Sequence, residues 1–230
     1  MYRKIDFQDL GTIEYKDAWK YQEALFNKLL DVKRNNIQQH ETIKKATSNH
    51  FIFCEHPHVY TLGKSGSENN LLINDDFLKK INATYYKTDR GGDITYHGYG
   101  QIVGYPIFDL ENFNIGIKDY IFKLEETIID TLKEFNIFAS RLDNATGVWI
   151  IQLQKQQYHK ICAIGVKASR WVTMHGFALN VNTDLSYFKH INPCGFVDKG
   201  VTSMQKELGY NVDLNKVKEI IKKNILEKFN

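Results

Sequence analysis

The sequence predicts an α+β fold, in which a single domain over residues 1–230 has a mixed β-sheet covered by helices. Strand-like stretches occur in clusters, separated by a few segments whose apolar residues recur at helical spacings of three and four. The chain has 230 residues, 43% of them hydrophobic, so it can bury one large core. It contains only three prolines, and no stretch rich in Pro, Gly or Ser divides it into domains.

Three segments have the periodicity of amphipathic helices. The first covers residues 17–32 and the strongest covers residues 117–136, whereas the last begins near Asp213, a residue type suited to the N-cap. Each segment gathers its apolar residues on one face, which predicts that this face packs against the sheet. These residues are Ala18, Tyr21, Leu25 and Leu29 in the first segment, Ile117, Ile121, Leu124, Ile128, Leu132 and Phe135 in the second, and Leu214, Val217, Ile221 and Ile225 in the third.

Six stretches between these helices have the composition of strands, with β-branched and aromatic residues. Together with the few helices they predict a mixed sheet, whose strand order the pattern leaves open. The stretches are HFIFCEH at 50–56, ATYYKTD at 83–89, QIVGYPIF at 101–108, TGVWIIQL at 146–153, HKICAIGVKA at 159–168 and TMHGFALNVN at 173–182.

Charge and cysteine content restrict the function classes. A net charge of +3 is too balanced for a dedicated nucleic-acid-binding protein and favours mildly acidic protein partners. Three cysteines without a Cys-x-x-Cys pair predict no disulfide framework and a reducing compartment. The N-terminal MYRKIDFQDLG lacks the apolar core of a signal peptide, and no apolar run approaches the roughly 18 residues that a membrane span needs. We therefore expect a cytoplasmic protein that binds neither membrane nor nucleic acid.

The first stretch that could carry chemistry is TDRGGDITYHGYGQIVGYP, residues 88–106. It holds five of the 15 glycines of the chain, and glycine lets the backbone approach a ligand closely. Arg90 could bind an anionic or carbonyl group there. A hairpin loop with turn glycines explains the same residues, so both interpretations stay open. The stretch matches neither a phosphate-binding loop nor a dinucleotide-binding fingerprint.

A second stretch, residues 158–182, contains two strand-like segments that are each interrupted by small residues. The interruptions, Ala-Ile-Gly at 163–165 and Gly-Phe-Ala at 176–178, suggest a slot for an apolar chain between the segments. A hairpin with glycine bulges is the alternative. Lys160, at the head of the first segment, is by residue type alone an exposed surface lysine.

The third stretch is INPCGF, residues 191–196, in which Cys194 stands between a proline that fixes the backbone and a glycine that frees it. The thiol would then be presented on a tight turn. A thiol with a pKa of about 8.5 is only a few per cent thiolate at neutral pH, so a nucleophilic role needs a nearby cation or base. Lys160, His97 and His175 are the candidates.

One further stretch, CEHPHVY at residues 54–60, places one cysteine and two histidines close together, as in a metal-binding tract. No second pair of ligands follows at a zinc-like spacing, so a structural turn is the preferred interpretation and no metal site is predicted. Cys162 lies within an apolar strand pattern, which is typical of a packed core position.

Four motifs occur here in the order and spacing of one known family: RGGDITYHGYGQIVGYP, HKICAIGVKASRWVTMHGFALNVN, INPCGF and GVTSM. By these motifs the chain resembles the octanoyl-[acyl carrier protein]:protein N-octanoyltransferases of lipoate biosynthesis, the lipoate-protein ligase B family. The resemblance extends from HPHVYTLGKSG to GVTSMQKELG, which is most of the chain. It implies a biotin/lipoate protein ligase-like fold and transfer of an octanoyl group to a protein lysine, the first step of endogenous protein lipoylation.

The resemblance also implies roles for individual residues. The family's thioester-forming cysteine corresponds to Cys194, and its thiolate-supporting lysine corresponds to Lys160. One departure is Tyr99, which stands where the family usually has proline, so that a stiff turn becomes a freer one. The family's acyl-binding segments correspond to Arg90, Gly91, Gly92, Asp93, Ile94, Thr95, Tyr96 and His97, to Ala163, Ile164 and Gly165, and to Gly176, Phe177 and Ala178.

The family's donor is octanoyl-acyl carrier protein, its acceptors are the lipoyl domains of 2-oxoacid dehydrogenase complexes and the glycine cleavage H protein, and no cofactor is implied. In such a lipoyl(octanoyl) transferase, Cys194 would take the acyl group as a thioester, and Lys160 or a nearby histidine would accept the proton of the incoming amine. Backbone N–H groups near Gly165 or after Arg90 could hold the oxyanion.

Two alternatives come from other classes. An ATP-dependent lipoate ligase of the same fold would use a lysine but no acyl-cysteine. A non-catalytic binding module for lipoyl domains or carrier proteins would need neither residue. Cys194 within its motif favours the transferase.

Overall fold

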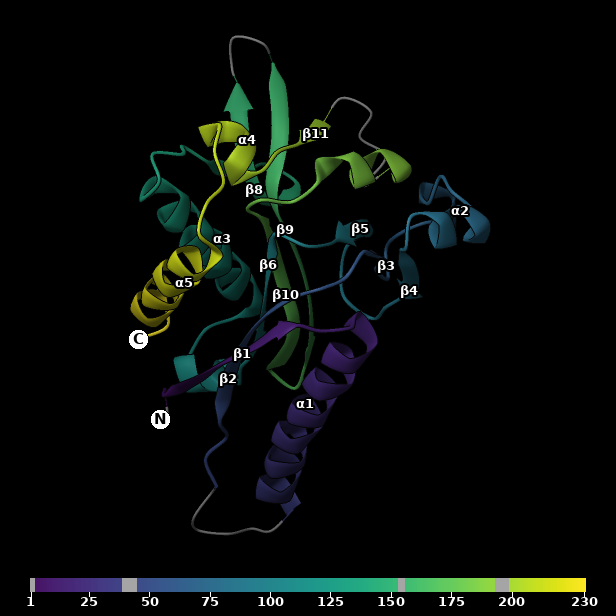
Figure 1. Cartoon of the computed structure of the whole chain (residues 1–230). Helices are drawn as coiled ribbons and strands as arrows, with labels where there is room; N and C mark the ends of the chain where they lie inside the picture. Colours follow the sequence, from purple (N-terminus) through teal and green to yellow (C-terminus); the bar gives the residue numbers. More distant parts are fainter. Residues whose placement is uncertain (1–2, 39–44, 153–155, 193–198) are drawn as a thin grey trace.

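The computed structural model describes residues 3–38, 45–152, 156–192 and 199–230 (Figure 1). Its largest feature is an eight-stranded sheet in the order β1-β2-β6-β10-β9-β8-β7, with β11 paired to β9. The pairs β1–β2 and β9–β11 are parallel and the others antiparallel, so the sheet is mixed as predicted. The strands are β1 (Ile5–Thr12), β2 (Asn49–Glu55), β6 (Gln101–Ile107), β7 (Ser140–Leu142), β8 (Ala145–Gln152), β9 (Gln157–Ser169), β10 (Val172–Asn180) and β11 (Lys199–Val201).

A second, three-stranded sheet has the order β4-β3-β5 and lies to one side of the main sheet (Figure 1). Strand β3 (Val59–Leu62) runs parallel to β4 (Thr84–Lys87) and antiparallel to β5 (Ile94–His97). The short helix α2 (Asp75–Lys80) contacts β4. A separate apolar core holds this unit together, made by Tyr60, Leu62, Leu78, Ala83, Ile94, Tyr96 and Ile191.

Helices cover both faces of the main sheet, which confirms the predicted α+β class. Helix α1 (Tyr15–Gln38) packs on one face against β6 and β10, whereas α3 (Ile117–Lys133) and α5 (Leu214–Lys228) pack together on the other (Figure 1). Because side chains alternate along a strand, Phe177 of β10 joins the core under α3 and α5, and its neighbour Ala178 joins the core under α1. Short helical segments complete the described chain: α4 (Met204–Leu208), η1 (Glu68–Asn70), η2 (Leu110–Phe113) and η4 (Leu185–His190).

The three predicted helices are present, and two of them have different ends. Helix α1 continues past residue 32 because no glycine or proline follows until residue 57. Helix α3 ends before residue 136 because Asn136 adopts a left-handed conformation with φ of 57°. Asp213 caps α5 as predicted, accepting a hydrogen bond from the Asn215 N–H at 2.9 Å. No helix in the described ranges has the length and apolar character needed to cross a membrane.

All six predicted stretches contain strands, namely β2, β4, β6, β8, β9 and β10, although residue 153 lies outside the described residues. Five strands were not predicted. Strands β7 and β11 have three residues each, too few to show a period. The short strands β3 and β5 follow turn-forming and glycine-rich sequence, and β1 is an edge strand that buries only one residue fully.

Candidate active site

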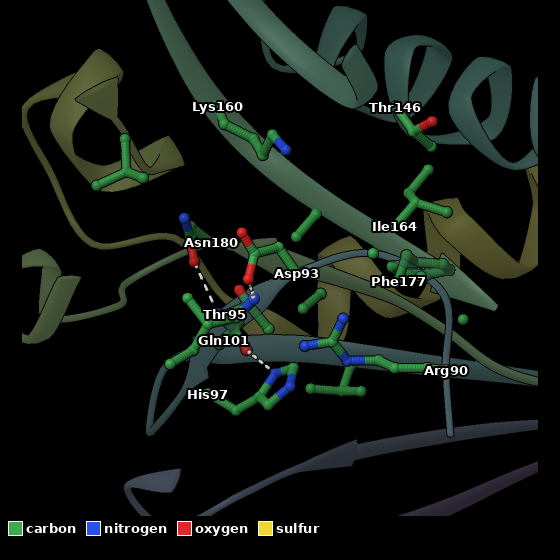
Figure 2. Close-up of a pocket in the computed structure, with 18 of the residues that line it drawn as sticks. Arg90, Asp93, Thr95, His97, Gln101, Thr146, Lys160, Ile164, Phe177 and Asn180 are labelled. Atoms are coloured by element: carbon green, nitrogen blue, oxygen red, sulfur yellow. Dashed lines mark hydrogen bonds between the residues drawn. The ribbon is translucent and has the colours of Figure 1, made fainter. Parts of the chain in front are cut away.

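A cavity of about 280 Å³ lies on the α1 side of the main sheet, where the loop before β5 crosses β9 and β10 (Figure 2). Strands from both sheets contribute to its walls, so its shape depends on how the two sheets dock. Lys160 lines the cavity, as do most of the residues assigned to acyl binding by resemblance: Arg90, Gly92, Asp93, Ile94, Thr95, His97, Ala163, Ile164, Gly165, Gly176, Phe177 and Ala178.

The paired strands β9 and β10 form the floor of the cavity. Their antiparallel register places Gly165 opposite Gly176 and Ala163 opposite Ala178, so the two small-residue interruptions face each other. The pairing is regular there, without the glycine bulges considered from the sequence. A Cβ on Gly165 would lie 2.7 Å from the carbonyl oxygen of Gly91. The hairpin and the slot, which were alternative interpretations of residues 158–182, are therefore one structure. The cavity exists above the hairpin because Ala163, Gly165, Gly176 and Ala178 have small side chains or none.

The loop of residues 90–93 is tied to both sheets. The Gly91 N–H donates to the carbonyl oxygen of Val166 in β9 at 2.9 Å, so it is not available as an oxyanion donor. The buried Arg90 guanidinium donates to the carbonyl oxygen of Thr61 at 2.5 Å, to the Thr61 hydroxyl at 3.0 Å and to the carbonyl oxygen of Gly91 at 3.0 Å. Arg90 thus fastens the loop to β3 while it lines the cavity.

Lys160 lies in β9 beside a bulge, at which Ile161 is the extra residue relative to β8. Its Nζ lies 4.6 Å from the centroid of the Trp149 ring, a cation–π distance. Gly147, with φ of 122°, packs against the lysine stem: a Cβ there would lie 3.5 Å from Lys160 Cε. Lys160 is therefore a held side chain in the wall of the cavity (Figure 2), not the exposed surface lysine that its residue type suggests.

Two histidines are the other candidates for a charge beside the nucleophile. Burial lowers the pKa of His97 well below its usual value. Burial also lowers the pKa of His175, and the Asp89 carboxylate, 2.7 Å from its Nε2, only partly offsets this effect. Burial therefore disfavours a positive charge on either ring.

Three other residues named from the sequence motifs lie away from the cavity or outside the described residues. Tyr96 is buried in the core of the small sheet, where its hydroxyl bonds His58 Nδ1 at 2.7 Å, and it does not line the cavity. Tyr99 is 50% exposed and does not line it either. Cys194 belongs to residues 193–198, which lie outside the described residues.

The two other cysteines are unsuited to nucleophilic chemistry. Cys54 and Cys162 are both fully buried. Burial raises the pKa of each thiol far above its ordinary value, so neither forms a thiolate near neutral pH. Cys162 is a core residue, as its strand pattern predicts.

The CEHPHVY stretch uses its histidines for structural hydrogen bonds. His56 Nδ1–H donates to the carbonyl oxygen of Ile13 at 2.8 Å, and the Tyr105 hydroxyl bonds its Nε2 at 2.8 Å. Burial lowers the pKa of His56 to about 4. Within the described ranges, no three His, Cys, Asp or Glu side chains come together as metal ligands.

Several lining residues were not predicted from the sequence. Gln101, Val103 and Tyr105 alternate along β6 and all face the cavity, a period of two that could have identified them. Tyr15 gave no such signal, because its position depends on where α1 begins relative to the sheet. The others are Asn144, Ala145, Thr146, Trp149, Asn180, Phe188, Gly200 and Val201.

Comparison with known proteins extends these observations. The model of the lipoyl protein ligase A/B catalytic domain matches residues 14–226. The chain is 54% identical over 227 residues to an octanoyltransferase of Cytophaga hutchinsonii, covering 99% of this chain and 93% of that one. It is also 54% identical over 230 residues to an octanoyltransferase of Flavobacterium johnsoniae, covering 100% and 98%. Among solved structures, a bipartite lipoate protein ligase of Thermoplasma acidophilum aligns with a TM-score of 0.68 at 15% identity, covering 99% and 84%.

The two kinds of match support different statements. The structural match confirms the predicted ligase-like fold, at an identity that shows the fold alone. The sequence matches span nearly the whole chain and confirm that this enzyme is an acyltransferase that moves octanoyl groups in lipoylation. The chain therefore belongs to the lipoyl protein ligase A/B catalytic domain family and, within it, to the octanoyltransferases.

Proposed function

We propose that this octanoyltransferase takes its acyl group from octanoyl-acyl carrier protein, holds it as a thioester on Cys194 and passes it to a lysine of a lipoyl domain. The observation that carries the proposal is the cavity, in which a floor of small residues and the Lys160 amine face the same space. An apolar chain can lie on that floor with its carbonyl carbon near the amine. Strand β11, which follows Cys194 in the sequence, pairs with β9 beside Lys160.

Elimination supports Cys194 as the nucleophile. The chain has three cysteines, and the other two are buried with raised pKa values. Lys160 is the one lysine among the described residues that line the cavity. An ammonium about 4 Å from a thiolate, at an effective dielectric near 20, favours the thiolate by up to about 4 kcal/mol, which is enough to make it the main form at neutral pH.

In the first half of the reaction, the Cys194 thiolate attacks the carbonyl carbon of the octanoyl thioester. The bond from this carbon to the carrier's phosphopantetheine sulfur breaks, and the leaving thiolate takes a proton from the Lys160 ammonium. The acyl group is then a thioester of the enzyme, and Lys160 is neutral. One thioester replaces another, so the step requires no ATP.

In the second half, the neutral amine of the acceptor lysine attacks the enzyme thioester. Its surplus proton passes to neutral Lys160 as the amide forms, and the bond between the carbonyl carbon and the Cys194 sulfur breaks. The enzyme returns to the thiolate and ammonium pair with which it began. The acceptors we propose are the lipoyl domains of 2-oxoacid dehydrogenase complexes and the glycine cleavage H protein, and a lipoyl domain is also the partner named for the Thermoplasma ligase.

Intact-mass measurement tests the proposal directly. Incubation of the protein with octanoyl-acyl carrier protein, without ATP, should add one octanoyl group. The adduct should be absent in Cys194→Ala and present in Cys54→Ala and Cys162→Ala, which serve as matched controls. Addition of a lipoyl domain should discharge the adduct and octanoylate the domain.

Three other outcomes would contradict the proposal. Full turnover by Cys194→Ala would exclude the covalent route. Transfer that begins only when ATP is added would identify an ATP-dependent ligase. Tight binding of the lipoyl domain without any transfer would identify a binding module.

A further inference from the structure

A chain of buried side chains joined by hydrogen bonds links the small sheet to the main sheet behind the cavity. It connects Thr61 of β3, His97 of β5, Gln101 of β6 and Asn180 of β10. Thr61 Oγ1 lies 3.2 Å from His97 Nε2, His97 Nδ1 lies 2.8 Å from Gln101 Oε1, and Gln101 Nε2 lies 2.8 Å from Asn180 Oδ1. Figure 2 marks the bonds of Gln101 to His97 and to Asn180 with dashed lines.

Arg90 fixes the direction of the chain at its first end. A guanidinium only donates, and Arg90 donates to Thr61 Oγ1 from Nε at 3.3 Å and from Nη2 at 3.0 Å. A hydroxyl that accepts these bonds has one hydrogen left to give, and the ring nitrogen beside it is His97 Nε2. This nitrogen must therefore be the unprotonated one.

Two backbone carbonyl groups fix the direction independently at the other end, because a carbonyl oxygen only accepts. Asn180 Nδ2 donates to the carbonyl oxygen of Thr202 at 3.0 Å, which turns the Asn180 oxygen toward Gln101. Gln101 Nε2 donates to that oxygen and to the carbonyl oxygen of Tyr96 at 3.1 Å. The Gln101 oxygen then faces His97 Nδ1, which must carry the hydrogen. Both ends specify the same tautomer.

We propose that Thr61, Gln101 and Asn180 are positioning residues for octanoyl transfer. Their one-directional chain holds His97 as the neutral tautomer with its hydrogen on Nδ1. His97 therefore acts as a link in the wall of the cavity and is not the base that takes the proton of the incoming amine.

The same chain reaches the backbone of the lysine. The carbonyl group of Thr202 accepts from Asn180, and the N–H of Thr202 donates to the carbonyl oxygen of Lys160 at 3.0 Å. Val201, one residue earlier, pairs with Lys160 in the β9–β11 register. A loosened chain would let Lys160 shift relative to the floor. This kinetic consequence depends on the proposed function of Lys160, whereas the tautomer does not.

The surroundings of His97 also oppose a second proton. A hydrogen on Nε2 would point at the Thr61 oxygen, which already accepts two N–H groups, and the hydroxyl hydrogen would lose its acceptor. Arg90 is a cation, and the His56 ring lies 5.8 Å from the His97 ring centroid. The other groups near His97 are Tyr15, whose ring stacks on it with centroids 5.9 Å apart, and His175, whose influence also lowers the pKa of His97. None of the four carries a negative charge that would stabilise an imidazolium.

Long-range proton–nitrogen NMR of the full chain, labelled with ¹⁵N-histidine, tests the tautomer. We expect one ring, assigned by its loss in His97→Gln, to carry hydrogen on Nδ1 and a lone pair on Nε2. It should not titrate between about pH 5 and pH 8, the range in which an ordinary histidine does. A His97 ring with its hydrogen on Nε2, or one that titrates near pH 6.5, would overturn the proposal.

A pair of Thr61 variants tests the positioning role. Thr61→Val keeps the shape but removes the hydroxyl that donates to His97 Nε2, so one end of the chain no longer holds the ring, and kcat should fall by about tenfold, the equivalent of one hydrogen bond. Gln101 still accepts from His97 Nδ1 in this variant, so the tautomer should not change. KM for octanoyl-acyl carrier protein should change by less than about twofold. Thr61→Ser restores the hydroxyl and should rescue kcat. Unchanged kcat in the valine variant would contradict the proposal, and its melting temperature verifies that it is folded.

The two proposals can fail separately. If the octanoyl adduct forms without Cys194, the proposed function fails while the His97 tautomer can still be as expected. If the adduct forms only on Cys194 and His97 carries its hydrogen on Nε2, only the positioning role fails.

Discussion

The cavity has two sides that are held by different physical means. The floor, residues 163–165 and 176–178, belongs to a regular strand pair, and what matters there is how little volume the side chains take. The loop side, residues 90–97 with Thr61 behind them, is held by directed hydrogen bonds between buried polar groups. Added volume should therefore damage the floor, whereas changes of polarity or protonation should damage the loop side.

The largest effect is expected from added volume in the floor. A Cβ on Gly176 would lie 2.1 Å from the carbonyl oxygen of Gly104 and 2.7 Å from Pro106 Cδ, both in the neighbouring strand, where the sheet prevents relaxation. Gly176→Ala should lower the free energy of unfolding by about 3 kcal/mol, measured by urea denaturation. Gly116→Ala is the control, because its nearest neighbour lies 3.8 Å away, and it should cost less than about 1 kcal/mol. If the two variants lost the same free energy of unfolding, the floor around Gly176 would not be tightly packed.

Acid should act on the loop side. The pKa of His56, which contacts the His97 ring, is about 4 in the folded protein against 6.5 when exposed, so the unfolded chain binds more protons between these values. Stability is then fully present above about pH 6.5 and falls by about 3 kcal/mol as the pH drops to about 4. His56→Gln should flatten this slope in pH-dependent urea unfolding, although His97 and His175 keep part of it because their pKa values are also lowered. Gly176→Ala should leave the pH dependence of the unfolding free energy unchanged. A weaker pH dependence in this variant would mean that the floor and the loop side are not held by different means.

Lys160 lies on the floor strand but should act through charge. Removal of the ammonium in Lys160→Met should raise the apparent pKa of Cys194 from below about 7 to about 8.5 or higher, measured from the pH dependence of iodoacetamide alkylation. Lys160→Arg keeps the charge but gives up its proton poorly, so alkylation should persist while amide formation slows. An alkylation profile that does not change in the methionine variant would show that Lys160 does not tune the thiol.

The smallest effect should appear where the two sides touch. A Cβ on Gly165 would lie 2.7 Å from the Gly91 carbonyl oxygen and 3.3 Å from Arg90 Nη1, so the loop of residues 90–93 must move against its hydrogen bonds to make room. Gly165→Ala should therefore cost about 2 kcal/mol of stability, less than Gly176→Ala, and displacement of the loop should raise KM for the octanoyl donor severalfold. Steady-state kinetics measures the change in KM, and urea denaturation measures the change in the free energy of unfolding, so the two effects can be separated. A loss of stability as large as that of Gly176→Ala would mean that the loop is as rigid as the sheet.

The contrast also explains which parts could be predicted from the sequence. Periodicity identified three helices and six strands, and the small residues of the floor were visible as interruptions of two strands. The loop side was not accessible in this way. Arg90 is oriented by Thr61, 29 residues earlier, in a strand that no pattern indicated. Lys160 enters the cavity wall beside a bulge at Ile161, and a bulge leaves no mark on the spacing of apolar residues.

The roles of the site residues could be inferred only from the family resemblance. The structure shows why the residue types alone did not define these roles. Arg90 was expected to meet a ligand, yet most of its hydrogen bonds go to the backbone and hydroxyl of neighbouring segments. Tyr96 shares a motif with the lining residues but, one position along β5 from His97, faces the small core instead. A motif records proximity in sequence, whereas alternation along a strand decides which side chains share a face.

The order of strands in the main sheet sets when the cavity can exist while the chain is being synthesised. Strand β6 lies between β2 and β10, and β9 lies between β10 and β8, so the floor is complete only after residues 176–178 have joined strands made much earlier. The carbonyl group of Thr202 enters later still. Because a growing chain emerges from its N-terminus, a ribosome-bound chain that lacks residues 199–230 already contains Cys194 but not β11 or Thr202. The wall of the cavity beside Lys160 is therefore among the last parts of the site to form during synthesis.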